Sequence, residues 1–216
     1  MILVVGSIDA LKYEICFILA SQGISIRALM LNPSNPVVVE RLKNYGTTLA
    51  FGDLQDPIFL ADAYLGVNGV ICSLSGLSSD QRYGPDLING DLIGMMNLID
   101  AAKDADVLRF VYISFSYNQD LNIPFRKGRQ VVEQHLIDSG IPYTILYAGD
   151  NQAQIPCTCD QVINRISTTD LAWLAVKNLE NLPQYDSAVK PVGSLKPVFK
   201  QKYNKGNTYP FMYKSC

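Results

Sequence analysis

The chain has 216 residues, of which 48% are hydrophobic and 18% charged, so it can bury one full core but is too short for two comfortable domains. Its net charge is only −2, and no run approaches the roughly eighteen apolar residues of a membrane span. Because such a run is missing, we expect no membrane span. The first residues have the pattern of a strand and not of a charged signal segment, and whether a leader has been removed stays open.

The cysteines and the single histidine bear on redox state and metal binding. Five cysteines are an odd number in a large apolar core, which fits reduced thiols better than a disulfide framework. Cys157 and Cys159 form the only close pair, and ordinary thiols are favoured there over a redox-active pair. With His135 as the only histidine, no cluster has the spacing of a metal site. We expect no metal and a reducing compartment, either the cytoplasm or the stroma or matrix of an organelle.

Apolar runs alternate with segments of helical periodicity along most of the chain. Strands are predicted over residues 2–6, 24–30, 47–51, 69–74, 108–114 and 143–147. Helices are predicted between Gly6 and Gly23 and over residues 37–45, 57–65, 87–103, 126–139 and 169–179. This alternation, with strands apolar on both faces, predicts an α/β fold: a single doubly wound, Rossmann-like domain whose parallel sheet is covered by helices on both faces. We assign residues 1–186 to this domain and residues 187–216 to a tail.

The first strand leads into the turn where such a fold places its phosphate loop. A dinucleotide-binding turn carries three glycines, which permit the turn, the approach of the pyrophosphate and close helix–strand packing. Here only Gly6 remains, because Asp9 and Lys12 stand at the second and third positions. A carboxylate at Asp9 would satisfy the free N–H groups of the helix and repel a pyrophosphate. The alternative is that Asp9 turns outward and Lys12 meets a phosphate.

Charge separates the tail from the body. Residues 1–186 hold twelve basic and twenty acidic residues, a net charge of −8, whereas the tail holds six lysines and no acid. Aromatic residues alternate with these lysines, and Pro191, Pro197 and Pro210 oppose a long helix. We predict a protein-interaction arm, with contacts through Lys200, Tyr203, Tyr209, Phe211 and Tyr213, and we favour docking on protein over binding of nucleic acid.

Several short stretches carry a resemblance to a known family over about residues 1–180. They are Ile2 to Gly6, Arg27-Ala28-Leu29, Tyr45-Gly46 through Gly52-Asp53-Leu54-Gln55-Asp56-Pro57, Leu65 to Ile71, Asn97 to Ala102, Arg109 to Ser114, Ser139 to Leu146 and Ile166 to Ala172. The chain resembles the atypical short-chain dehydrogenase/reductase group, in particular the NmrA-like proteins and the NAD(P)H-binding flavin and biliverdin reductase type. The resemblance implies a Rossmann-like fold more strongly than any one activity.

Positions that carry function in this family are largely replaced. The arginine that would hold an adenosine 2′-phosphate corresponds to Leu31, and the catalytic Tyr/Lys pair, aligned through Glu133, falls on Phe125 and Arg129. Phenylalanine has no proton to donate and guanidinium does not titrate near neutral pH. We therefore assign no catalytic residue and expect no classical Tyr/Lys chemistry.

The turn and the family resemblance together indicate which residues could still contact a cofactor. If NAD(P)(H) binds at all, the residues to meet it are Gly6, Ser7, Ile8, Asp9, Asp53 and Ser114. Asp53 is equally well explained as part of a plain turn after the third strand, and Ser114 as a strand-end serine. We expect weak cofactor binding or none.

Two functions stay open. The first is a degenerate NmrA-like pseudoenzyme that serves as a structural, assembly or regulatory subunit of a larger protein complex. The second is an NAD(P)H-dependent reductase with a modified cofactor site, which passes hydride directly to a flavin-, tetrapyrrole- or quinone-like acceptor. Coincident loss of the turn glycines and the Tyr/Lys pair favours the first.

Overall fold

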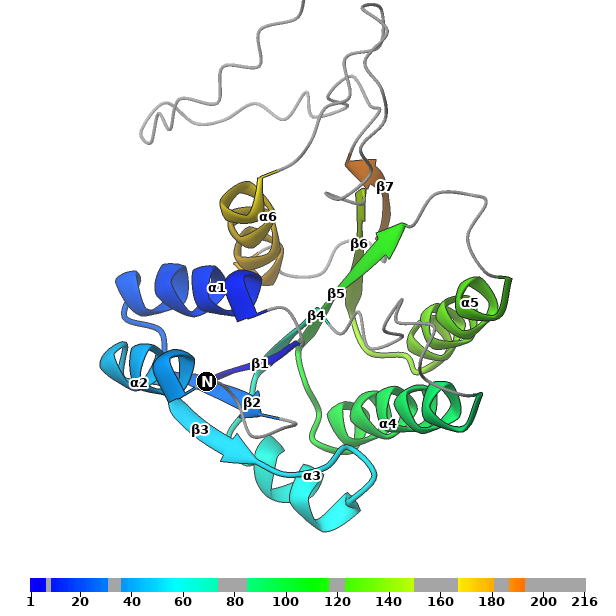
Figure 1. Cartoon of the computed structure of the whole chain (residues 1–216), viewed down its shortest axis with the longest axis horizontal. Coiled ribbons are helices and arrows are strands. Elements are labelled where there is room, and N and C mark those ends of the chain that lie inside the picture. Colours follow the sequence, from blue (N-terminus) through cyan, green and yellow to red (C-terminus); the bar gives the residue numbers. More distant parts are fainter. Residues whose placement is uncertain are drawn as a thin grey trace, which may run out of the picture.

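A seven-stranded parallel sheet forms the centre of the protein (Figure 1). The structure, a computed structural model, describes residues 1–6, 9–30, 36–73, 85–116, 123–149, 167–180 and 187–192. The strands are β1 (Ile2–Gly6), β2 (Ile26–Met30), β3 (Thr48–Phe51), β4 (Gly69–Ser73), β5 (Arg109–Ser116), β6 (Tyr143–Gly149) and β7 (Ser187–Val192). Their order in the sheet is β3-β2-β1-β4-β5-β6-β7. The chain therefore adds β2 and β3 on one side of β1 and then crosses back to add β4 to β7 on the other side.

Six helices cover the sheet from both sides, as the alternation of strands and helices predicted. They are α1 (Asp9–Ser21), α2 (Pro36–Asn44), α3 (Pro57–Tyr64), α4 (Pro85–Asp104), α5 (Ile123–Asp138) and α6 (Thr168–Glu180). Figure 1 shows α1, α2 and α6 on one side of the sheet and α3, α4 and α5 on the other. The doubly wound fold is thereby confirmed.

Each inner strand supplies side chains to two hydrophobic cores. In β1, Leu3 and Val5 enter the core beneath α3, α4 and α5, while Val4 enters the core beneath α1, α2 and α6. All three side chains are fully buried. Because successive side chains of a strand point to opposite faces, an apolar run is needed where both faces are covered.

The seventh strand was not among the six that the sequence predicted. β7 pairs with β6 in parallel and begins at Ser187, where the predicted tail also begins. Its sequence, SAVKPV, contains Pro191, and a proline is tolerated in a sheet at an edge strand, where no further strand requires its N–H. The strand was not predicted because this segment is short and contains a proline, so it shows no clear apolar periodicity.

Several predictions fall outside the described residues. They are Leu31, the pair Cys157 and Cys159, and the tail contacts Lys200, Tyr203, Tyr209, Phe211 and Tyr213. Across the described ranges, none of the helices combines the length and the apolar character required to cross a bilayer.

Arg27 holds the end of α3 against the sheet. From β2, its Nη1 donates to the main-chain oxygens of Ala63 at 2.7 Å and Leu65 at 2.9 Å. These carbonyls lie at the C-terminus of α3, where the helix leaves acceptors without partners and favours a positive charge.

We predict that Arg27→Met lowers the free energy of unfolding by about 1–3 kcal/mol, because carbonyls at a helix end lose a charged donor. Urea denaturation of the purified protein measures the change. Lys103→Met, at an exposed position of α4, is the control and should change stability by no more than about 0.5 kcal/mol. Equal effects of the two substitutions would contradict the role of Arg27.

Candidate functional site

The carboxyl ends of the parallel strands meet at one edge of the sheet, which is where open α/β folds bind ligands. Gly6 is the last residue of β1, Asp53 follows β3, and Ser114 lies in β5 two residues before its end. The structure thus brings these three predicted residues to the same edge. Ser7 and Ile8 lie outside the described residues, and of Asp9 only the backbone, the first residue of α1, is described.

Gly6 is required by the close approach of β1 and β4. It stands opposite Ser73 in the strand register, and a Cβ added at Gly6 would lie 2.2 Å from Ser73 Oγ. The Ser73 hydroxyl is buried and donates to the main-chain oxygen of Val5 at 3.5 Å. Any side chain at position 6 would therefore have to displace this hydroxyl, so strand packing alone accounts for the glycine.

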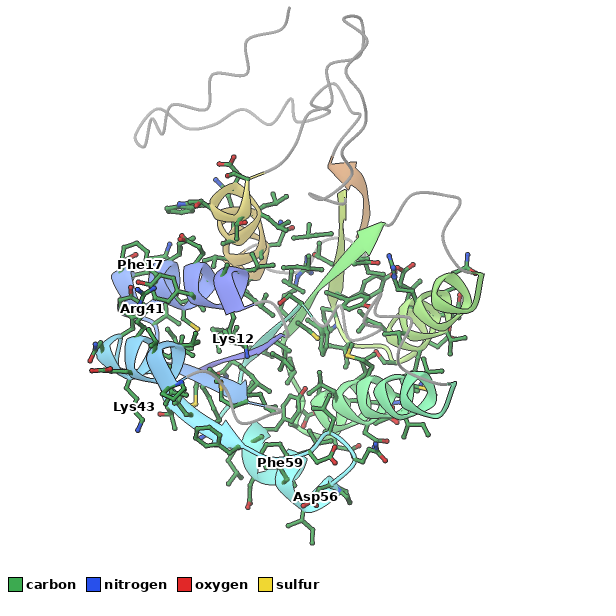
Figure 2. The ribbon with its side chains drawn as sticks, in the orientation of Figure 1. Lys12, Phe17, Arg41, Lys43, Asp56 and Phe59 are labelled. Atoms are coloured by element: carbon green, nitrogen blue, oxygen red, sulfur yellow. The ribbon has the colours of Figure 1, made fainter. Side chains whose placement is uncertain are left out.

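Lys12 occupies the position of the third turn glycine, and its side chain is directed into the protein. Its Nζ donates to the main-chain oxygen of Leu29 at 3.4 Å and lies 3.8 Å from Met30 Sδ. Figure 2 shows Lys12 beneath α1, on the side that faces β1 and β2. Only 3% of the residue's surface is exposed.

This arrangement does not fit a dinucleotide turn. The third glycine of such a turn lets the helix lie close on the strand, and here a lysine chain fills that space up to the carboxyl end of β2. Burial also keeps the ammonium group from a phosphate in solution unless the side chain moves.

Cys16 lies one turn further along α1 and shares the surroundings of Lys12. Its side chain is fully buried, and burial raises the pKa of the thiol from 9.0 to about 12, although the positive charge of Lys12 opposes the rise. The thiol is protonated at neutral pH and is therefore a poor nucleophile.

Ser114 donates its hydroxyl hydrogen to Glu133 across the space between β5 and α5. The distance from Ser114 Oγ to Glu133 Oε1 is 2.8 Å, and the serine is 1% exposed. A buried hydroxyl of this kind needs an acceptor, and Glu133 supplies it. The sequence placed Ser114 correctly at the carboxyl edge, but it carried no signal for this pairing, since the two residues are nineteen positions apart.

Two positions near Ser114 in sequence align with the catalytic pair of the reductases. These positions, Phe125 and Arg129, both lie on α5, which begins at Ile123 and not at residue 126 as predicted. Arg129 is half-buried, and the side chain of Phe125 is not among those described.

Asp53 belongs to a compact turn that leads into α3. Its Oδ1 accepts a hydrogen bond from the backbone N–H of Gln55 at 2.9 Å, and Asp56 caps the helix by accepting from Ile58 and Phe59. The ring of Phe59 packs on Gly52, where an added Cβ would lie 2.4 Å from the ring (Figure 2). The turn is explained by local structure, while the exposed carboxylate of Asp53 still has capacity to accept a further bond.

His135, the single histidine, lies on α5 as a surface residue. Its Nε2 is 2.7 Å from Asp100 Oδ1 on α4, and the pair joins the two helices on their outer side. Among the described residues, no group of three side chains is placed to hold a metal ion.

The sequence of this chain is similar to a known protein family and to several named proteins. The sequence profile of the NmrA-like family matches residues 1–161. The photosystem II assembly factor Ycf39 of Cyanophora paradoxa is 30% identical over 145 residues, which cover 67% of this chain and 43% of that protein. Ycf39 of Guillardia theta is 28% identical over 194 residues, covering 82% of this chain and 60% of that protein. The chain thus spans less than two thirds of the length of these relatives.

Solved structures with the same fold include reductases bound to nicotinamide cofactors. Triphenylmethane reductase of Citrobacter sp., complexed with NADP(H), is 25% identical with a TM-score of 0.52, and the match covers 68% of this chain and 48% of that one. AtPrR2 with NADP+ and (+)pinoresinol has a TM-score of 0.62 at 18% identity, covering 83% of this chain and 65% of that one. Because AtPrR2 is only 18% identical to this chain, that match shows a shared fold and nothing more.

The raised pKa of Cys16 predicts a loss of stability in alkali. Above pH 9 the unfolded chain releases the thiol proton while the folded chain retains it up to about pH 12, so the free energy of unfolding falls as the pH rises through this window. One such group contributes a slope of about 1.4 kcal/mol per pH unit. Urea unfolding of Cys16→Ala at a series of alkaline pH values should show a slope shallower by about this amount.

The matched control is Ile15→Val, which also removes buried volume from α1 but no titrating group. It should lower stability at every pH and leave the slope unchanged. An unchanged slope in Cys16→Ala would show that the thiol does not titrate differently in the two states.

Proposed function

Because this chain belongs to the NmrA-like family, we propose that it is a noncatalytic member that serves as a structural, assembly or regulatory subunit of a larger protein complex. The observation that carries the proposal is the burial of Lys12, whose side chain occupies the space that a dinucleotide turn leaves to glycine. A domain that keeps the fold but fills its cofactor turn retains surfaces for binding proteins and loses the means of hydride transfer.

The pairing of Ser114 with Glu133 supports the same proposal. In this chain the serine at the carboxyl edge donates to an internal carboxylate, so its hydroxyl hydrogen is not available to a substrate. The aligned Phe125 and Arg129 provide neither a proton donor nor a group that titrates near neutral pH.

The relatives indicate what kind of complex to expect. Ycf39 is named a photosystem II assembly factor, and another relative, from Arabidopsis thaliana, is named chloroplastic. This likeness supports the proposal that the chain works in a plastid or a similar organelle stroma and assists the assembly of a multi-subunit complex. Contact with the partner runs through the basic aromatic tail, at Lys200, Tyr203, Tyr209, Phe211 and Tyr213.

A reductase is the second candidate, and one observation favours it. The chain is 25% identical to the NADP(H) complex of triphenylmethane reductase. In that case Lys12 would have to leave its buried position for the cofactor to enter.

We predict that the native protein shows no binding of NADH or NADPH in the low micromolar range by isothermal titration calorimetry. The double variant Asp9→Gly with Lys12→Gly should gain measurable affinity, because it removes a carboxylate from the helix N-terminus and opens the space between α1 and β2. Low-micromolar binding by the native protein would overturn the noncatalytic assignment and support the reductase.

Asp9→Asn with Lys12→Met is the matched control, since it removes both charges and keeps the side-chain length. Affinity in the glycine variant alone identifies filled space as the obstacle, whereas affinity in both variants identifies charge. Circular dichroism checks the fold, because two glycines in a helix cost about 2 kcal/mol relative to good helix formers.

The tail contact is tested in the full chain with Tyr203, Tyr209, Phe211 and Tyr213 each replaced by serine. Because these residues follow β7, the substitutions leave the sheet intact. Affinity purification from the source organism, quantified by mass spectrometry, should show loss of the co-purifying complex. Recovery equal to that of the native chain would exclude the tail as the principal contact.

A further inference from the structure

An aromatic cluster lies where α1 and α2 meet at the surface. Tyr13 and Phe17, one turn apart on α1, both contact Tyr45, with ring centroids 5.3 Å and 5.5 Å from that of Tyr45. The hydroxyl groups of Tyr13 and Tyr45 are hydrogen-bonded, which raises the pKa of Tyr45 to about 12 and keeps its phenol uncharged at neutral pH. The guanidinium carbon of Arg41, on α2, lies 5.7 Å from the centre of the Tyr13 ring.

Part of this surface is apolar and open to solvent. Phe17 is 48% exposed, and Val37, one turn before Arg41 on the same side of α2, is 54% exposed. Figure 2 shows Phe17 and Arg41 on the side of the domain away from α3, α4 and α5. Tyrosine, phenylalanine and arginine are the residue types that are enriched in the buried centre of protein interfaces. The contact between α1 and α2 does not account for the exposed area of Phe17 and Val37.

Charges of both signs surround the cluster. Helices α1 and α2, with α6 packed beside α1, carry four basic and five acidic residues, namely Asp9, Lys12, Glu14, Glu40, Arg41, Lys43, Asp170, Lys177 and Glu180. Glu40 and Arg41 are neighbours on α2 and both are exposed. Lys43 extends from α2 on the side away from α1 (Figure 2). The undescribed residues 31–35, which connect β2 to α2, add no charge.

A surface with balanced charges is suited to contact with a second copy of itself. In a two-fold symmetric dimer both copies contribute the same patch, so every contact between two different residues occurs twice. A patch of one sign would repel its copy, as α4 would with its four aspartates and one lysine. On the α1–α2 surface, Glu40 of each copy can meet Arg41 of the other.

We propose that two copies of this chain associate through the α1–α2 surface, with Phe17 and Val37 in contact with the second copy and Glu40 of each copy beside Arg41 of the other. The ring contacts leave the aromatic side chains few alternative rotamers, so association orders little that is not already ordered. Because the exposed apolar area is small, we expect a weak dimer, with a dissociation constant of roughly 10–100 µM. This dimer concerns the free chain and does not depend on whether the protein is catalytic.

Sedimentation velocity of the full chain, from about 5 to 300 µM under reducing conditions, tests the association. The weight-average mass should rise from that of a monomer toward that of a dimer across this range. A monomer at every concentration would overturn the proposal.

Charge exchange tests the pairing of Glu40 with Arg41. Glu40→Arg and Arg41→Glu should each weaken self-association about tenfold or more, because two contacts between opposite charges become two between like charges. An equal mixture of the two variants should associate as the native chain does, because arginine then faces glutamate at both contacts.

The matched controls are Asp104→Arg and Lys103→Glu, which make the same changes of net charge at exposed positions of α4. Each should dimerise as the native chain does. If the control variants lose association to the same extent, the contact lies on another side of the domain. Failure of the mixture to recover association would contradict the pairing.

A substitution at the exposed ring tests the apolar part of the contact. Phe17→Ser should weaken the dimer about tenfold, because a large apolar side chain no longer becomes buried. Ile58→Ser, at a residue of α3 that is 75% exposed, should leave the dimer unchanged. Equal losses in the two variants would also count against the α1–α2 surface. Neither sedimentation result bears on the calorimetric test of cofactor binding, so the two proposals fail separately.

Discussion

Burial of the parallel sheet between two layers of helices is the constraint on which this protein depends. The strands near the centre must present apolar side chains to both faces, as Leu3, Val4 and Val5 do in β1. Because the whole side-chain complement of such a strand is committed to the two cores, polar chemistry can be placed only where the strands end. The predicted residues Gly6, Asp53 and Ser114 accordingly lie at the carboxyl edge.

At that edge, side chains that face ligands in a dinucleotide-binding protein contact other parts of the protein instead. Lys12 reaches the carbonyl of Leu29, Ser114 donates to Glu133, and one oxygen of Asp53 accepts the N–H of Gln55. Each of these contacts satisfies a polar group that would otherwise be exposed or buried without a partner. All three contacts lie at the edge where open α/β folds bind ligands.

The distribution of charge gives the two sides of the domain different properties. α4 carries four aspartates and one lysine, whereas α2, on the opposite side, carries two basic residues and one glutamate. Net charge alone, at −2, does not reveal this separation, because it sums over sides that face in opposite directions.

Local pattern was sufficient to predict most of the fold and part of the site. Apolar runs and helical spacing determined six strands, six helices and the two-sided sheet, because these depend on the period of each short segment. The strand β7 was not predicted, because SAVKPV has no clear period and its proline is acceptable only at a sheet edge, which the folded structure creates. The sequence by itself also established that Asp9 and Lys12 replace turn glycines. Only the tertiary structure decided that Lys12 points inward to β2 and that Ser114 meets Glu133, because both contacts join segments whose separation in space is set by packing and not by their order in the chain.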